Sequence, residues 1–180
     1  MNFPSDKNKN QKEEEDEHGM KEENKKAEVD FAAILTGKEE VPEVNTWDTA
    51  LATFQYTINN YNNNNNNNKK DKNEKDDDLT YSVKVTDTDK IKEVNIHTGN
   101  PNEKGDVVAE LYKSATPSRE VIMDNITKGK IRSKDLKGPL EGKKTQELIR
   151  KIEKGEVYVD IKTEDKPKGK VRGKIKKISR

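Results

Sequence analysis

The sequence predicts an all-β protein, an antiparallel β-sandwich with one short helix. Three observations support this class: short segments in which apolar and polar residues alternate, glycine-rich turns between them, and a single stretch with helical spacing. Alternation with period two sends successive side chains to opposite faces of a strand, so that one face can be buried. Many short strands of this kind are typical of antiparallel sandwiches.

Composition limits how much of the chain can join that domain. Of the 180 residues, 28% are hydrophobic and 39% are charged, and apolar residues are scarcest in residues 1–29 and 59–78. Such segments bury too little surface to offset their conformational entropy. We therefore predict a disordered charged tail over 1–29, a domain over 30–178, and a low-complexity loop of Asn, Lys and Asp inserted at 59–78. His18 is expected to be solvated within the tail.

The strands are expected in a simple order along the chain. A buried strand at 31–37 ends at a glycine, and a longer alternating strand follows at 48–58. The alternation resumes after the insertion at 79–85. Ser133 is suited to cap a single helical turn. Further strands are expected at 93–99, 107–112, 121–126, 130–132, 157–162 and 170–176, with a turn at Lys128 and Gly129.

One helix is expected over residues 146–154. Thr145 is a suitable N-cap, and Gly155 is suited to end the helix in a left-handed conformation. Leu148, Ile149 and Ile152 recur at helical spacing and form one apolar stripe. The stripe predicts that the helix packs on the edge of the sandwich.

Several classes of function lack support in the residues. The chain has no cysteine, so disulfides, thiolate zinc sites and cysteine nucleophiles are excluded. It shows neither a nucleophile-elbow motif nor a glycine-rich phosphate loop. With a net charge of only +1, the chain as a whole has no strong electrostatic attraction to nucleic acid or to an anionic membrane. We find no apolar run of membrane-spanning length and no secretory-signal pattern in the first 30 residues, and we predict no catalytic residue and no cofactor.

The stretch at residues 93–99 contains one of the two histidines of the chain. In a strand, Val94 and Ile96 would face one side while Asn95 and His97 would face the other. An Asn-x-His pair is either half of a metal site or a hydrogen-bonded polar pair. Whether Asn95 and His97 form a metal site or a polar pair depends on which other residues of the chain lie beside them.

Four strings occur in the order typical of one known family. They are FAAILTGKEEVP at 31–42, NIHTG at 95–99, GEVYVDIKT at 155–163 and GKVRGKI at 169–175. Together they resemble the CHRD (chordin-type) domain, whose pattern is roughly LTGxxEVPP, HIHxG, YVNxHT and GEIRGQ. The resemblance covers about residues 30–176 and implies an immunoglobulin-like sandwich or barrel, similar in outline to copper/zinc superoxide dismutase. It also implies an extracellular or cell-surface setting and no established enzymatic activity.

The chain departs from the family pattern where metal ligands would be expected. Asn95 replaces the first histidine of His-x-His, and Lys162 stands where the later motif has a histidine. An amide binds transition metals poorly, a protonated amine cannot bind them, and one imidazole does not make a zinc or copper site. No metal is therefore predicted. We expect His97 to bond to the backbone or to Asp160, with a small-ligand site at Asn95, His97, Asp160, Lys162 and Arg172 as the alternative.

Two further features have a structural and a functional interpretation. Arg172 matches the family arginine and is expected to form an ion pair with Glu43 or Asp160 rather than to bind a ligand. Residues 39–42 are expected to form a turn on the sheet rather than an acidic site. The basic C-terminal strand either binds a polyanion or is an edge strand protected by lysines, with these side chains on one side: Lys168, Lys170, Arg172, Lys174 and Lys176.

The leading hypothesis is a non-enzymatic CHRD-type module that binds a protein or a polysaccharide or has a structural role. The alternatives are a metal-dependent enzyme of superoxide-dismutase-like outline and polyanion binding through the basic strand. Single-stranded nucleic acid has little support because aromatic residues do not interleave with the lysines. The sequence specifies neither a ligand nor an oligomeric state nor a compartment.

Overall fold

The computed structural model describes residues 27–58, 77–100, 102–116 and 125–179. The predicted tail over 1–29 and the predicted insertion at 59–78 fall almost wholly outside these residues, as does His18. Those three expectations stay predictions. None of the described helices is long and apolar enough to cross a membrane.

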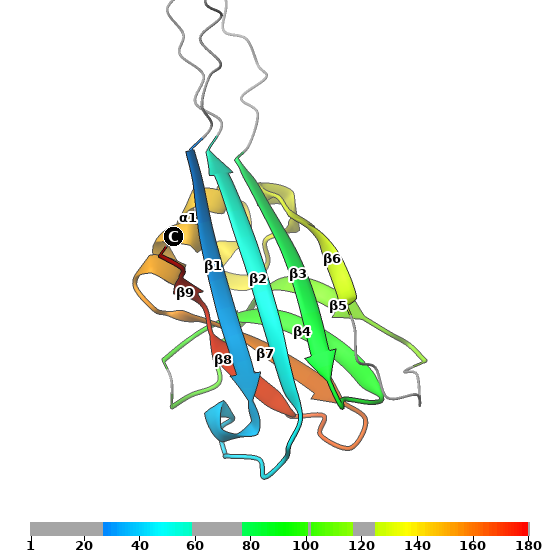
Figure 1. Cartoon of the computed structure of the whole chain (residues 1–180). Coiled ribbons are helices and arrows are strands. Elements are labelled where there is room, and N and C mark those ends of the chain that lie inside the picture. The colour runs from blue at the N-terminus through cyan, green and yellow to red at the C-terminus, as the bar shows by residue number, and fades with distance from the viewer. Residues whose placement is uncertain (1–26, 59–76, 101, 117–124, 180) are drawn as a thin grey trace, which may run out of the picture.

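The described strands form one antiparallel sheet with the order β5-β4-β7-β8-β1-β2-β3-β6, and β9 pairs with β1 outside that path (Figure 1). The two ends of the path approach each other, so the sheet is nearly closed into a barrel. The strands are β1 (Ala27–Thr36), β2 (Thr49–Ile58), β3 (Asp78–Thr86), β4 (Ile91–Thr98), β5 (Val107–Lys113), β6 (Asn125–Ile131), β7 (Val157–Thr163), β8 (Val171–Lys174) and β9 (Lys176–Lys177).

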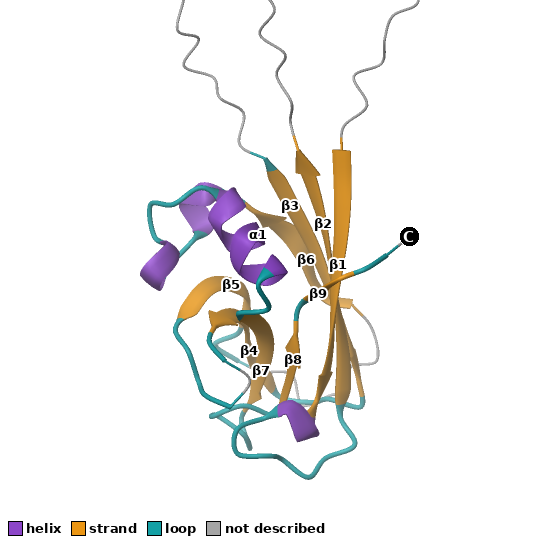
Figure 2. Ribbon diagram, turned by 90° about the vertical axis from the view of Figure 1, so that its left-hand side faces the viewer, coloured by secondary structure: helices purple, strands orange, loops and turns teal. Residues whose placement is uncertain are grey.

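The sheet curls into two layers that face each other (Figure 2). β1, β2, β3 and β6 form one layer, β4, β5 and β7 form the other, and β8 connects them. Alternation holds in β2, where every second residue from Ala50 to Tyr56 is buried as expected. The space between the layers is filled by fully buried apolar side chains, among them Phe31, Leu35, Leu79, Val83, Ile96, Val108, Ile161 and Ile175.

Side chains bridge the gap between the two ends of the sheet. Tyr81 of β3 and Thr127 of β6 each donate a hydroxyl hydrogen bond to the carbonyl oxygen of Leu111 in β5, at 3.0 and 2.9 Å. Tyr81 lies opposite Gly129, where a Cβ atom would come within 2.8 Å of the tyrosine hydroxyl. The predicted turn at Lys128 and Gly129 is therefore wrong, because this glycine makes room for an aromatic ring inside a continuous strand. The predicted strand at 121–126 lies mostly outside the described residues.

The expected helix is confirmed as α1 (Thr145–Glu153), which lies over one open end of the barrel (Figure 2). Its apolar stripe is buried, and Gly155 has the left-handed φ of 74° that was expected after the helix. Thr145 is the first helical residue instead of the cap. Its backbone N–H donates a hydrogen bond at 3.1 Å to the hydroxyl oxygen of Ser133, which lies in η2 (Ser133–Asp135). The described residues include three short 3₁₀ helices, η1 (Gly37–Glu39), η2 and η3 (Gly138–Leu140).

The all-β antiparallel class with one short helix is confirmed, whereas the superoxide-dismutase-like sandwich detail is not. One expectation about β8 is wrong: it is not an edge strand. β8 pairs with β7 along four residues and with β1 where Arg172 lies opposite Thr36. β7 is the preceding strand, but β1 lies near the other end of the described chain, so the lysines of β8 alone could not show that it lies inside the sheet.

The close contact between β8 and β1 gives a test of this arrangement. A Cβ atom at Gly173 would lie 2.2 Å from the carbonyl oxygen of Ile34, so Gly173→Ala must push the two strands apart. We expect a loss of about 3 kcal/mol in the free energy of unfolding, measured by urea denaturation. Gly142→Ala is the control, because its Cβ would meet no atom within 4 Å and only its φ of 72° opposes the change. Its loss should be about 1 kcal/mol, and equal losses in the two variants would contradict the packing of β8 on β1.

Candidate functional site

The motif residues come together on the outer face of β4, β7 and β8. Antiparallel pairing places Asn95 opposite Asp160, and Asp160 opposite Arg172, so the three form one row across the strands. His97 lies opposite Tyr158 in the next row. Directly opposite residues point to the same face of a sheet, so these five side chains share one surface. All five are nonetheless buried, since other parts of the chain cover that surface.

Arg172 joins the sheet to the loop between β4 and β5. Its guanidinium donates hydrogen bonds to the carbonyl oxygens of Glu103 at 2.9 Å and Asn100 at 3.0 Å. The same group lies over the ring of Tyr158, with the guanidinium carbon 3.4 Å from the ring centre. The expected ion pair with Glu43 or Asp160 is therefore replaced by bonds to backbone carbonyls, which lie 72 and 69 residues away in sequence.

His97 is held by the same loop. Its Nδ1–H donates to the carbonyl oxygen of Gly105 at 2.9 Å, so the expectation of a backbone partner is confirmed. Its ring stacks on Tyr158, with 5.1 Å between centroids and 5° between planes. The hydroxyl of Tyr158 accepts a hydrogen bond from the Gly105 N–H at 3.0 Å. Burial lowers the pKa of His97, and the nearby charges of Lys162 and Arg172 lower it further, so the imidazole is neutral at pH 7.

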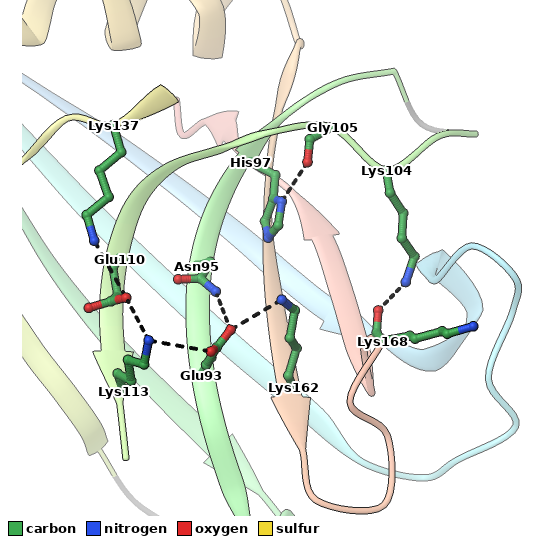
Figure 3. A network of polar contacts seen from close by, with 10 residues as sticks. All are labelled: Glu93, Asn95, His97, Lys104, Gly105, Glu110, Lys113, Lys137, Lys162 and Lys168. Atoms are coloured by element: carbon green, nitrogen blue, oxygen red, sulfur yellow. Dashed lines mark hydrogen bonds and ion pairs between the residues drawn. The ribbon is translucent and has the colours of Figure 1, made fainter. Parts of the chain in front are cut away.

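Glu93 connects Asn95 and Lys162 beside this stack (Figure 3). The Asn95 amide and the Lys162 amine each donate to Glu93 Oε2 at 3.2 Å, and Lys113 lies 3.9 Å from the other oxygen. Burial alone would raise the pKa of Glu93, but the bond and charge of Lys162 outweigh it and the pKa is lowered. The two motifs therefore adjoin, and the lysine that replaces a histidine is held by a carboxylate.

Two carboxyl groups are buried nearby. Burial raises the pKa of Asp160, and the charge of Glu40 adds to this effect, bringing the pKa to about 7. Burial also raises the pKa of Glu40, against the charge of Lys104, whose amine is 3.8 Å away. Lys104 donates a further bond to the carbonyl oxygen of Lys168, which connects the β4–β5 loop to the β7–β8 loop (Figure 3).

Four buried atoms of this group make no hydrogen bond within the described chain: Glu40 Oε1, Asn95 Oδ1, His97 Nε2 and Asp160 Oδ1. With Nδ1 carrying the proton, His97 Nε2 presents a lone pair, so all four can accept hydrogen bonds. A buried acceptor without a partner costs about 1–3 kcal/mol. Protonation of Asp160 removes the charge from one of them and converts its carboxyl group into a donor.

The donors around His97 are poorly matched to a metal. No group of three or more His, Cys, Asp or Glu side chains in the described part of the chain is arranged to hold a metal ion. The positive charges of Lys162, Arg172 and Lys104 all act on His97 and would repel a dication. A divalent ion would have to displace these charges before it could use the Nε2 lone pair.

The structure separates the predicted basic stripe into different environments. Arg172 is buried in the cluster described above. Lys170 forms ion pairs with Asp48 and Asp165, both at 3.0 Å, and these raise its pKa against the effect of burial. Lys168 and Lys176 are exposed, and Lys174 is partly exposed. The stripe is therefore not one continuous basic face.

Sequence reasoning missed Glu40, Tyr158 and Lys104. The predicted turn at 39–42 corresponds to the end of η1 and bends at residues 40–42, but Glu40 is 4% exposed and belongs to the buried charge cluster. Tyr158 alternates with buried valines along β7, and this pattern gives no sign of its contacts with His97 and Arg172. The string at 31–42 lies far from the others in sequence, so its proximity to them emerges only from the fold.

These features define a nearly closed antiparallel β-module in which a histidine, a tyrosine and an arginine hold a loop on the sheet. A family model described as the CHRD domain matches residues 31–175. The chain belongs to the CHRD domain family, as its motifs indicated. Searches of curated proteins and of solved structures gave no match.

The raised pKa of Asp160 predicts a specific pH dependence. Between about pH 4 and pH 7 the folded state keeps a proton that the unfolded state has released, so stability falls as pH rises. The expected slope is up to about 1.4 kcal/mol per pH unit. Asp160→Asn removes this titration, so the variant should gain stability over the wild type as pH rises from 4 to 7 in urea unfolding. Parallel stability curves would show that Asp160 is ionised in the folded protein.

Asp165→Asn provides a control of opposite sign. A hydrogen bond from Thr163 lowers the pKa of Asp165, with a further contribution from Lys170. The stabilisation from this carboxylate is present above its unfolded pKa and is lost as pH falls through the folded value. The Asp165→Asn variant should therefore lose stability relative to the wild type as pH rises through the acid range.

Proposed function

We propose that this CHRD domain is a non-enzymatic module with a binding or structural role. The proposal is supported by the hydrogen bonds that Arg172, His97 and Tyr158 make with the β4–β5 loop. Arg172 and His97 donate to three carbonyl oxygens of that loop, and Tyr158 accepts an N–H from it. Groups fixed in this way position the backbone of a loop, which is a common way to build a binding surface on a rigid scaffold.

General base catalysis by His97 has little support from this geometry. A catalytic base must lie within hydrogen-bond reach of the proton that it removes. Nδ1 of His97 is committed to Gly105, and Nε2 is buried, with positively charged groups nearby. The hydroxyl of Tyr158 is bonded to the loop, and burial raises its pKa, which disfavours the phenolate.

The metal-enzyme alternative would need further ligands beside His97. Catalytic zinc sites use three protein ligands and leave a fourth position open. The two positions that the family motif would fill with histidine are Asn95 and Lys162, and both side chains bond to Glu93. We therefore favour a structural role for His97.

A metal titration of the full-length chain tests this proposal. We expect that excess zinc or copper changes the melting temperature of EDTA-treated protein by no more than about 1 °C. His97→Ala should lower the melting temperature by the same amount with and without metal, because the loss comes from the loop contact. Stoichiometric metal in the purified protein, with stabilisation that His97→Ala abolishes, would contradict the proposal.

Arg172→Lys tests the structural role from a second direction. A lysine can retain the charge but cannot donate the same two planar bonds or stack on Tyr158. We expect a loss of about 3 kcal/mol in the free energy of unfolding. Amide hydrogen exchange should show faster exchange at Gly105 and Asp106 than in the wild type. Unchanged exchange in this loop would contradict the anchoring role of Arg172.

A further inference from the structure

A groove of about 380 Å³ runs along the outer face of β1, beside β9. β9 crosses next to β1 near the C-terminal end of the chain (Figure 1). Register pairs Phe31 with Lys177 and Ala32 with Lys176, and the N–H of Ile178 donates to the carbonyl oxygen of Asp30 at 2.9 Å. The groove is therefore built by strand pairing, which fixes the positions of the side chains along it.

The groove contains an apolar surface that water contacts. Ala32, Ile34 and Ile178 line it, and Ile34 is 71% exposed while Ile178 is 44% exposed. Leu51 is the cross-strand partner of Ile34 on β2 and is 41% exposed, so the apolar surface continues onto the next strand. A contiguous exposed apolar patch with a polar rim is typical of a protein interaction site.

The rim of the groove is strongly basic. Lys174, Lys176 and Lys177 line it together with one acid, Glu39. None of these three lysines forms an ion pair within the described residues, in contrast to Lys170 and Lys162 elsewhere in the sheet. The groove thus has an excess of positive charge that an acidic partner would complement.

The groove continues into a second, smaller hollow of about 90 Å³. Glu39, Lys174 and Lys176 line both, and Tyr158 and Arg172 line the second. The two hollows together form an elongated path from Ile178 towards the side chains that anchor the β4–β5 loop. An elongated path with an apolar base and a basic rim suits an extended chain better than a compact small molecule.

We propose that this groove binds an extended acidic segment of a protein partner that also carries apolar side chains. The proposal rests on the non-enzymatic binding role and names its site and partner class. In an extended peptide, side chains alternate between two sides and recur about every 6.6 Å on each side. A segment that alternates acidic and apolar residues can therefore present carboxylates to the lysines and apolar groups to Ile34.

The apolar base distinguishes a polypeptide from other polyanions. A sulfated polysaccharide or a nucleic acid backbone would use the lysines but gain little from Ile34 and Ile178. Charge contacts at a rim chiefly affect the rate of association and its salt dependence, whereas apolar contacts at the centre slow dissociation. A site for an acidic peptide should therefore depend on both kinds of residue.

The test uses the full-length chain and a fluorescein-labelled eight-residue peptide of alternating Glu and Leu, followed by fluorescence anisotropy. The wild type should bind this peptide, and should bind peptides of alternating Glu and Ser or of Lys and Leu at least about tenfold more weakly. Lys174→Glu with Lys176→Glu should weaken binding about tenfold or more. Ile34→Ser should weaken it about fivefold, and the exposure of Ile34 means that the fold should tolerate this change.

The matched control is Lys134→Glu with Lys143→Glu, which makes the same charge change at exposed lysines outside the groove. Its affinity should stay within about twofold of the wild type. Three results would overturn the proposal: no binding by the wild type, an equal loss in the control, or binding insensitive to Ile34→Ser. Heparin that binds equally well to the Ile34→Ser protein and displaces the peptide would assign the groove to a polysaccharide instead. None of these results depends on metal content or turnover, so failure here is distinguishable from failure of the non-enzymatic role.

Discussion

The contacts of the buried Arg172 guanidinium hold the β4–β5 loop against the motif residues on the sheet. A buried charge is tolerated only where hydrogen bonds and nearby polar groups replace its hydration. Two loop carbonyls and the face of Tyr158 supply this replacement, and they lie on segments that only the fold brings together. Gly173, the next residue, lets β8 approach the backbone of β1, so the same strand positions the arginine and connects the two layers.

The charges around Arg172 are arranged so that repulsion between the basic groups is limited. Lys162 forms an ion pair with Glu93, and Lys104 lies beside Glu40, while burial and the charge of Glu40 raise the pKa of Asp160 to about 7. His97 is kept neutral by burial and by the positive charges near it. In this way three acids, a histidine and three basic groups lie close together where the β4–β5 loop covers the sheet.

The sequence predicted correctly those elements whose formation depends on a local pattern of apolar residues. Alternation identified β2 and β7, and the spacing of Leu148, Ile149 and Ile152 identified α1, because burial of one face determines those elements. The turn at Gly129 was wrong because that glycine accommodates Tyr81 from a neighbouring strand. The partners of Arg172 could not be predicted, since backbone carbonyls carry no sequence signal and these lie about 70 residues away. Glu40 and the groove beside β9 were missed for the same reason: each depends on pairing between distant strands.

In the arrangement described above, His97 holds the β4–β5 loop as a neutral donor through Nδ1. Nitrogen-15 NMR of the imidazole rings reports the protonation state of His97, and a His18→Gln variant assigns the signals of the two histidines. We expect the neutral tautomer protonated at Nδ1 to predominate at pH 7 and pH 8, and to be unchanged by one equivalent of zinc. A ring that is mostly protonated at pH 7, or a shift of the Nε2 resonance on addition of zinc, would show instead that His97 titrates or binds metal.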